Sequence, residues 1–122
     1  MTIYQTRLQQ LEDRTLNFGV SVVKTIGPFN KDVTLRPLAT QLIRSATSIG
    51  ANYAEANNAS SKADFKNKIY IAKKEAAETR YWLKVFGKLV DERTFQQLQQ
   101  EALELNLIFQ KIVSSLKVKN GK

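Results

Sequence analysis

The sequence predicts an all-α protein, an antiparallel up-down-up-down four-helix bundle that forms one domain over residues 1–122. Four long segments carry apolar side chains at three- and four-residue intervals, the period of an amphipathic helix. Short connections separate these segments, so consecutive helices are expected to pack as antiparallel neighbours. The chain has only 5 Gly and 2 Pro, which is few for an all-β protein.

The first two helices are expected at residues 5–26 and 35–56. The break between them contains Gly27 and Pro28, which interrupt helices. Thr34 is a suitable N-cap for the second helix, and Pro37 is tolerated in a first turn. The expected core stripes are Leu8, Leu11, Thr15, Phe18, Val22 and Ile26 on the first helix, and Leu38, Leu42, Ile49, Tyr53 and Ala56 on the second.

The third and fourth helices are expected at residues 62–90 and from about 91–94 to 116. Ser61 and Asp64 form a capping box that starts the third helix. The residues after the fourth helix, 117–122, form a basic tail that is expected to fray. The expected core stripes are Phe65, Ile69, Ala72, Ala76, Leu83 and Val90 on the third helix, and Phe95, Leu98, Ala102, Leu105, Phe109, Ile112 and Leu116 on the fourth.

Composition excludes several kinds of chemistry. The chain has no Cys and no His, which removes disulfides, histidine general bases, and thiolate or imidazole zinc sites. A cysteine-free chain suits a reducing compartment. The N-terminal segment lacks the apolar region of a signal peptide, and no apolar run is long enough to span a membrane. We therefore expect a cytoplasmic protein without cofactor.

Positive charge is concentrated on the third predicted helix. The chain has a net charge of +8, which favours polyanionic partners. Residues 62–88 hold eight Lys or Arg against three Asp or Glu. At about 100° per residue, five of these cations fall within about 40° and extend over about 33 Å. We call them, with the slightly offset Lys88, the basic stripe: Lys62, Lys66, Lys73, Arg80, Lys84 and Lys88.

The basic stripe has two interpretations. Cations along a rod can replace the counterions condensed on RNA or DNA, which would make the stripe a nucleic-acid-binding surface. Alternatively, it is an ordinary solvated helix face. Such a face usually mixes acidic and basic residues, whereas Glu75 and Glu78 lie on the other side of the helix. Tyr70, Tyr81 and Trp82 could stack on bases, but we expect Tyr81 and Trp82 to pack in the core or an interface.

The third helix also has a second apolar side, made by Ile71, Trp82, Val85 and Leu89. A helix that is apolar over most of its circumference is buried over most of it. This helix therefore either lies deep within the bundle of a monomer or also contacts another subunit, and we favour a homo-oligomer.

Residues 48–57, SIGANYAEAN, place small and polar residues inside the second helix, where they usually reduce stability. Small side chains allow a neighbouring helix to approach closely, and buried polar atoms then need partners. We therefore expect a hydrogen-bonded structural seam between the second and third helices, which would fix their register. Its members are Arg44, Ser48, Asn52, Glu55, Glu75 and Glu78.

A catalytic or metal site is the competing interpretation of these carboxylates. Glu75 and Glu78 at i and i+3, together with Glu55, are loosely similar to the carboxylates of di-iron bundles. Those sites need Glu-x-x-His pairs, and this chain has no histidine. We expect no enzyme activity, catalytic residue or bound metal.

Residues 35–86 resemble a known family. The segment contains Arg44, then S-I-x-x-N-x-A-E at 48–55, S-K-x-x-F at 61–65, and A-x-x-E-x-x-E-T-x-x-W-L at 72–83. In this order and spacing, the motifs are similar to those of the four-helix-bundle proteins encoded in intervening sequences of 23S ribosomal RNA genes. One departure is at residues 56–57, Ala-Asn, where many members have Gly after the Glu.

The resemblance implies a bundle that assembles as a ring-shaped homopentamer. It also implies a relation to accessory proteins of diversity-generating retroelements, which are similar basic barrels that engage reverse transcriptase and nucleic acid. It offers no established biochemical activity for the intervening-sequence members.

Two functions follow from the sequence. The first is a non-enzymatic homo-oligomer that binds RNA or DNA without sequence preference through the basic stripe, helped by Arg36, Lys111 and the tail lysines. The second is a protein-interaction scaffold, for example for a reverse transcriptase, in which the cations complement an acidic partner. Membrane binding is disfavoured, because the apolar helix faces are needed for the bundle.

Overall fold

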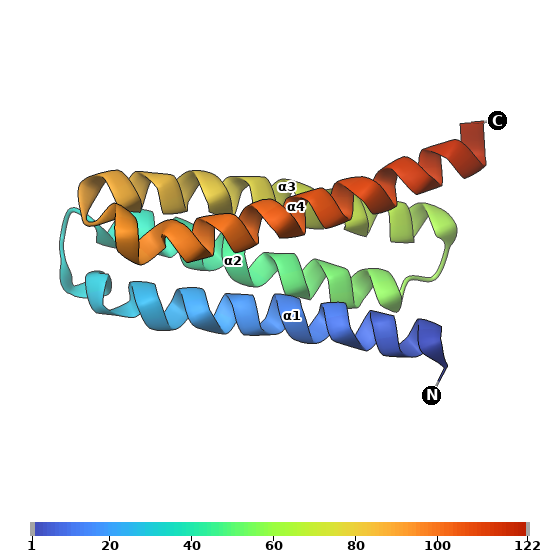
Figure 1. Ribbon diagram of the computed structural model, residues 1–122, viewed down its shortest axis with the longest axis horizontal. Coiled ribbons are helices and arrows are strands. Elements are labelled where there is room, and N and C mark those ends of the chain that lie inside the picture. Colours follow the sequence, from blue (N-terminus) through green and yellow to red (C-terminus); the bar gives the residue numbers. More distant parts are fainter. Residues whose placement is uncertain (1, 122) are drawn as a thin grey trace.

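The computed structural model describes the backbone of residues 2–121 and the side chains of residues 2–117. Four helices run alternately up and down: α1 (Ile3–Ile26), α2 (Arg36–Asn57), α3 (Lys62–Leu89) and α4 (Glu92–Gly121). A short 3-10 helix, η1 (Gly27–Lys31), precedes the turn into α2. Both chain ends lie at the same end of the bundle (Figure 1). The predicted fold class is confirmed, and the described residues contain no strand.

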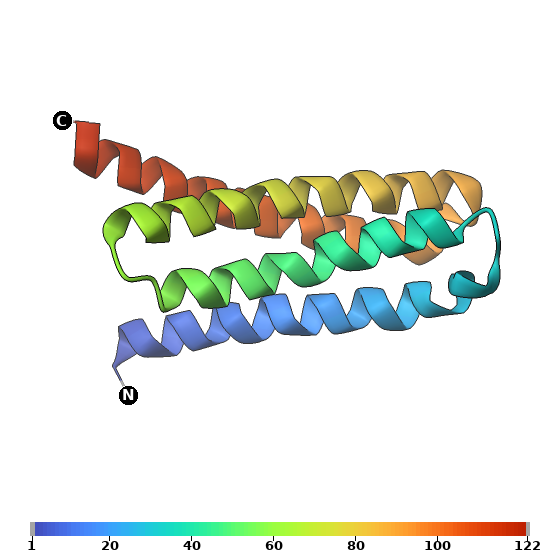
Figure 2. The same ribbon diagram turned by 180° about the vertical axis from the view of Figure 1, so that it is seen from behind.

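Helix α4 continues beyond the predicted end. The sequence indicated an end near Leu116, but the helix extends to Gly121. Figure 2 shows its last turns projecting past the body of the bundle. The side chains of residues 118–122, in the predicted basic tail, lie outside the described residues.

The helix starts are capped by residues that the sequence identified only in part. The Ser61 half of the predicted capping box is confirmed, because its hydroxyl accepts a hydrogen bond from the amide of Asp64 at the start of α3 (3.0 Å). The prediction for Thr34 was wrong. The Asp32 carboxylate takes that place, accepting from the amides of Thr34 (2.8 Å) and Leu35 (3.0 Å), because its position before the helix lets it reach both donors.

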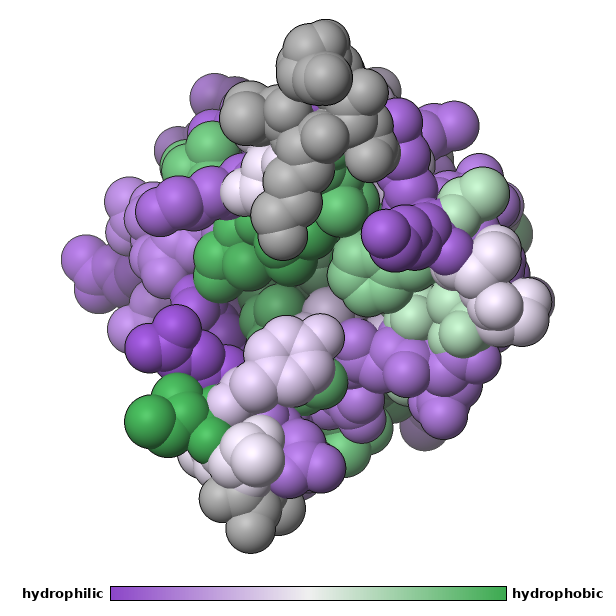
Figure 3. All heavy atoms as spheres, turned by 90° about the vertical axis from the view of Figure 1, so that its right-hand side faces the viewer, coloured by the Kyte–Doolittle hydropathy of each residue, from purple (hydrophilic) through white to green (hydrophobic). Residues whose placement is uncertain are grey.

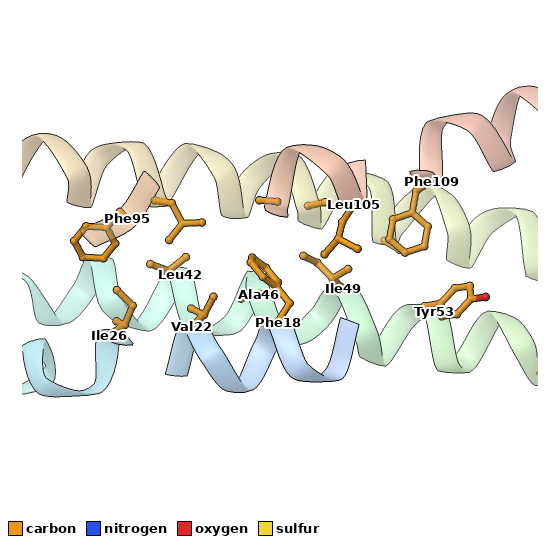
Figure 4. Close-up of a cluster of buried hydrophobic side chains, with 14 of the residues drawn as sticks. Phe18, Val22, Ile26, Leu42, Ala46, Ile49, Tyr53, Phe95, Leu105 and Phe109 are labelled. Atoms are coloured by element: carbon orange, nitrogen blue, oxygen red, sulfur yellow. The ribbon is translucent and has the colours of Figure 1, made fainter. Parts of the chain in front are cut away.

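The core is an apolar layer along the bundle axis, to which all four helices contribute (Figure 4). Three aromatic rings close the η1 end: the Phe86 ring lies 5.7 Å from both Phe29 and Phe95, measured between centroids. At about 25 cal/mol per Å² of apolar surface, this burial is the main stabilising contribution to the fold. The largest fully buried apolar side chains are Phe86, Phe95, Phe109, Ile26, Leu42, Ile49, Ile69, Leu83, Leu105, Val22 and Val113.

Most predicted core positions are buried, and the exceptions lie near helix ends or beside the stripe centre. Val90 is exposed because α3 ends at Leu89. On α4, Val113 is fully buried, whereas Ile112 is only half-buried. Six other predicted core residues are half-buried: Leu8, Leu11, Leu38, Phe65, Leu98 and Leu116.

Helix α1 approaches α2 closely near the middle of the bundle. A Cβ atom added to Gly50 would lie 3.1 Å from Thr15 Oγ1 and 3.4 Å from the Thr15 carbonyl carbon. Gly50 therefore permits the close approach that the SIGANYAEAN segment suggested.

Packing is most extensive between consecutive helices, and α1 makes few contacts with α4. A groove of about 570 Å³ follows their seam, lined in part by Gln10, Asn17 and Ser21. Ion pairs bridge it: the Arg14 guanidinium donates to Glu101 (2.7 Å) and to Glu104 (2.8 Å).

At the end of the bundle that holds both termini, hydrophobic side chains gather within a hydrophilic surround (Figure 3).

Candidate nucleic-acid interface

The basic stripe follows one face of α3. Lys62, Lys84 and Lys88 are exposed. Lys66, Lys73 and Arg80, in the middle of the stripe, are half-buried. Half-burial of long basic side chains is typical where their aliphatic stems lie on the protein and their charged ends reach water.

Five members of the basic stripe have no carboxylate within 4.0 Å among the residues that the structure describes: Lys62, Lys66, Lys73, Arg80 and Lys84. Lys88 differs, because its ammonium lies 3.1 Å from Glu92. The ion pairs of α3 to α2 use other residues, on the opposite side of the helix. The five unpaired cations therefore keep their charge available for an external anion.

Tyr70 lies among positive charges near the middle of the basic stripe. The Lys117 ammonium, from α4, lies 5.8 Å from the centre of its ring. The pKa of the Tyr70 phenol is lowered, first by its hydrogen bond with Lys117, and then by the positive charges of Lys117, Lys66 and Lys73. Nearby cations favour the phenolate because it is negatively charged. Lys117 thus extends the basic surface onto α4.

A hollow of about 170 Å³ lies between α3 and α4 beside the basic stripe. Arg80, Lys84 and Tyr81 line it from α3, and Leu103 and Asn106 line it from α4. The Tyr81 side chain is 59% exposed. Tyr81 therefore does not pack in the core, which was one of the two expectations for it, because its ring lies at the surface beside the basic stripe. Its packing in an interface with another subunit stays a prediction.

Trp82 has a different environment from its neighbour Tyr81. It is half-buried against the hydrophobic core. Its indole nitrogen donates a hydrogen bond to Glu78 Oε2 (3.0 Å). The Tyr81 and Trp82 rings meet edge to face, with centroids 5.1 Å apart. Trp82 thus packs in the bundle, as the sequence suggested, while supporting the exposed ring beside it.

Three members of the expected seam come together between α2 and α3. The Arg44 guanidinium donates to Glu75 (3.2 and 3.3 Å) and to Glu78 (2.7 Å). These bonds raise the pKa of Arg44. Burial opposes ionisation of Glu78, but hydrogen bonds from Trp82 and Arg44 outweigh it and hold the pKa of that carboxyl below its ordinary value.

The other three expected members do not join this cluster. Asn52 donates to the Ser48 carbonyl oxygen (2.8 Å), a bond within α2. Glu55, whose side chain is 57% exposed, pairs with Lys68 on α3 (2.7 Å). It lies near the C-terminal end of α2, about three turns beyond Arg44, so it does not reach that cluster. Its pair with Lys68 nevertheless joins α2 to α3, as expected of a member of the seam.

A buried hydroxyl pair between α2 and α3 was missing from the expected seam. Thr79 Oγ1 donates to Ser45 Oγ (2.9 Å), and both residues are fully buried. Ser45 in turn donates to the Leu42 carbonyl oxygen (3.1 Å). The signal for this pair was present in the sequence, because Ser45 and Thr79 each lie next to an apolar stripe.

The described residues contain no group of three or more Asp or Glu side chains placed to hold a metal ion. Glu75 and Glu78 instead share Arg44.

On the second apolar side of α3, Ile71, Trp82 and Val85 are half-buried, and Leu89 is 59% exposed. This side is therefore only partly covered within one chain.

Comparison with known proteins decides the family. Residues 9–111 match the model of a family described as 23S rRNA-intervening sequence protein. The chain belongs to this family. The match covers parts of all four helices, whereas the sequence resemblance rested on the two central ones.

A solved structure of the same architecture supports the assignment to the 23S rRNA-intervening sequence proteins. It is the crystal structure, at 1.70 Å resolution, of a protein with unknown function of the S23 ribosomal protein family from Bacteroides thetaiotaomicron. That protein is 35% identical to this chain, with a TM-score of 0.77. The similarity covers 84% of this chain and 96% of the other. No curated protein gives a significant match.

None of the described helices combines the length and the apolar character that crossing a membrane requires.

Proposed function

We propose that this 23S rRNA-intervening sequence protein acts without catalysis, in the cytoplasm, by binding RNA or DNA through the basic stripe on α3. The observation that carries this proposal is the row of five unpaired cations from Lys62 to Lys84. At a rise of about 1.5 Å per residue, the row is about 33 Å long. A row of this length can contact successive phosphates along one strand.

Two features support a polyanion over small anions. The cations are spread along a helix and do not converge on one point, so no single phosphate can contact all of them. Lys117 adds a charge from α4 beside Tyr70, which widens the surface. Lysines on phosphates read no base edges, so binding is expected to be independent of sequence and sensitive to salt.

Charge reversal tests the proposal. We expect the triple variant Lys66→Glu, Lys73→Glu, Arg80→Glu to lose binding to random-sequence RNA and DNA in a gel shift at low salt. The matched control is the triple variant Arg7→Glu, Lys24→Glu, Lys31→Glu, whose targets are exposed cations outside α3. Both variants have the same net charge, so the control should lose only the small, general electrostatic attraction. Equal binding by the two variants would contradict the proposal.

The alternative function is a protein-interaction scaffold, with a reverse transcriptase as the partner type suggested by the family resemblance. It predicts that the parent protein gives no gel shift with either nucleic acid at any salt concentration. The same assay therefore separates the two functions.

We further propose that the protein is a homo-oligomer and that α1 provides the subunit contact. Leu16, Val20 and Val23 form a row of apolar side chains on one face of α1, exposed to 62%, 44% and 40%. Leu16 also borders a hollow of about 400 Å³ whose α2 side is made by Gly50, Ala51 and Ala54. A row of exposed apolar side chains beside a hollow of small residues suits another helix.

Light scattering tests the assembly. The chain mass is 13.9 kDa, and the family resemblance implies about five times this mass for the parent protein. The double variant Leu16→Glu, Val20→Glu should be a monomer, while Leu107→Glu, at another exposed apolar residue on α4, should keep the parent mass. A monomeric parent would refute the assembly. A double variant of parent mass would refute the α1 contact.

A further inference from the structure

Phosphate binding by the basic stripe gives no role to Tyr81. This aromatic residue is 59% exposed and lines the hollow between α3 and α4 together with Arg80 and Lys84. Phosphate contacts need only the two cations. The exposed ring is therefore available to a ligand group that is itself flat.

The hollow offers a mixed lining that suits one heterocyclic base. Ala77 and Leu103 provide apolar surface, and Tyr81 provides an aromatic one. Asn106 adds an amide whose nitrogen donates to the Lys73 carbonyl oxygen (2.9 Å), which leaves its oxygen as an acceptor. At about 170 Å³ the hollow is smaller than the ~300–1,000 Å³ of sites for drug-sized molecules, so it accommodates one ring system.

Contacts behind the Tyr81 ring hold it in place. Its edge-to-face partner Trp82 donates to Glu78, and Glu78 accepts from Arg44. The chain Arg44–Glu78–Trp82–Tyr81 thus runs from the α2–α3 seam to the surface. A ring that is held before binding loses less entropy when a ligand stacks on it.

Tyr70 provides a useful contrast on the same side of α3. It lies eleven residues before Tyr81, about three turns away and in nearly the same direction. Its ring is half-buried and already lies near the Lys117 ammonium (5.8 Å). Tyr81 is therefore the aromatic ring of the stripe region that remains open.

From this arrangement we propose that Tyr81 and the hollow beside it form a stacking subsite for an unpaired base, so that the protein prefers single-stranded nucleic acid to duplex. The proposal rests on the function proposed above, because Arg80 and Lys84 are to hold the phosphates on either side of the stacked base. Unpaired bases expose the faces that stack on aromatic rings, whereas a duplex buries them between neighbouring pairs. Stacking also adds no sequence preference, since every base has such a face.

The test compares three ligands of equal length by fluorescence anisotropy at one low salt concentration: oligo(U), a single strand of abasic residues, and an RNA duplex. We expect Tyr81→Ala to weaken oligo(U) binding by about 5- to 150-fold, the range for loss of one base–aromatic stack. Its affinity for the abasic strand and the duplex should not change. Tyr81→Phe should bind like the parent because it keeps the ring.

A control variant and the stripe variant make the outcomes distinguishable. Leu89→Ala removes an equally exposed apolar side chain from α3 that does not line the hollow, and it should bind all three ligands like the parent. The stripe triple variant should lose all three ligands. Suppose the stripe triple variant loses all three ligands while Tyr81→Ala binds oligo(U) normally, or weakens oligo(U) and duplex binding equally. The stacking subsite is then refuted, and nucleic-acid binding by the basic stripe is supported. If the parent binds none of the ligands, both proposals fail.

Discussion

The close approach of α1 to α2 at Gly50 can be tested by adding one methyl group. In Gly50→Ala, the new Cβ would lie 3.1 Å from Thr15 Oγ1 and 3.3 Å from Thr15 Cβ. Thr15 cannot rotate away easily, because its hydroxyl bonds to the carbonyl oxygens of Leu11 (3.0 Å) and Glu12 (2.9 Å). The helices must therefore move apart slightly.

The magnitude follows from two opposing contributions. Replacing Gly by Ala inside a helix stabilises it by about 1 kcal/mol. Overpacking against a fixed neighbour costs about 1–3 kcal/mol. The net change in the free energy of unfolding for Gly50→Ala is thus between about 0 and −2 kcal/mol.

Gly19→Ala is the matched control, since Gly19 lies on α1 in the same interface. Its added Cβ would be 3.6 Å from Thr47 Cα and Cγ2, an ordinary contact. This variant should keep the full helix-propensity gain of about 1 kcal/mol, which raises Tm by about 3–5 °C for a chain of this size. Thermal unfolding followed by circular dichroism should place Gly50→Ala at least about 3 °C below Gly19→Ala. Equal stabilisation by both substitutions would refute the close approach.

Three further predictions concern the contacts between α2 and α3. Ser45→Ala and Thr79→Val should each destabilise the protein by about 1 kcal/mol in urea unfolding, because each removes the hydrogen bond between the two hydroxyls while the remaining hydroxyl keeps a backbone carbonyl acceptor. The double variant should destabilise it by less than the sum, because both single variants remove that same hydrogen bond; strict additivity would show that the pair is not coupled. The pKa of Glu78 is lower in the folded protein than its ordinary value near 4.5, so its contribution to stability is present above that value and is lost as the pH falls through the folded pKa. Glu78→Gln should therefore make the free energy of unfolding less dependent on pH below about 4.5, and an unchanged pH profile would contradict this. Glu55→Ala should leave Tm close to that of the parent, because its pair with Lys68, although it joins α2 to α3, lies at the surface; a large loss would show that this pair stabilises the seam.

Helical periodicity was sufficient to predict the architecture. The stripe from Leu42 through Ile49 to Tyr53 is buried as the three- and four-residue spacing requires, and the bend at Gly27 and Pro28 lies where the sequence placed it. Helix ends were less predictable. Asp32 and Thr34 are both good capping residues, and only the path of the chain decides which of them reaches the free amides.

Side-chain pairing across helices was the less predictable part of the candidate site. The expected seam correctly named Arg44, Glu55, Glu75 and Glu78 as side chains that join α2 to α3, but sequence angles alone could not show that Glu55 pairs separately, with Lys68. Tyr81 illustrates the same limit. By helical angle Tyr81 lies about 80° from the centre of the basic stripe. Whether a ring at that angle is covered depends on where α4 crosses α3.

The central claim is that the unpaired cations of the basic stripe contact phosphates, and the salt dependence of binding measures this most directly. If all five cations reach the phosphates of a single strand, the logarithm of the association constant should fall with the logarithm of salt concentration with a slope of about −3.5 per bound subunit. The stripe triple variant, if any binding remains, should show a slope shallower by about 2. A parent slope near zero, or the same slope in both proteins, would contradict the account.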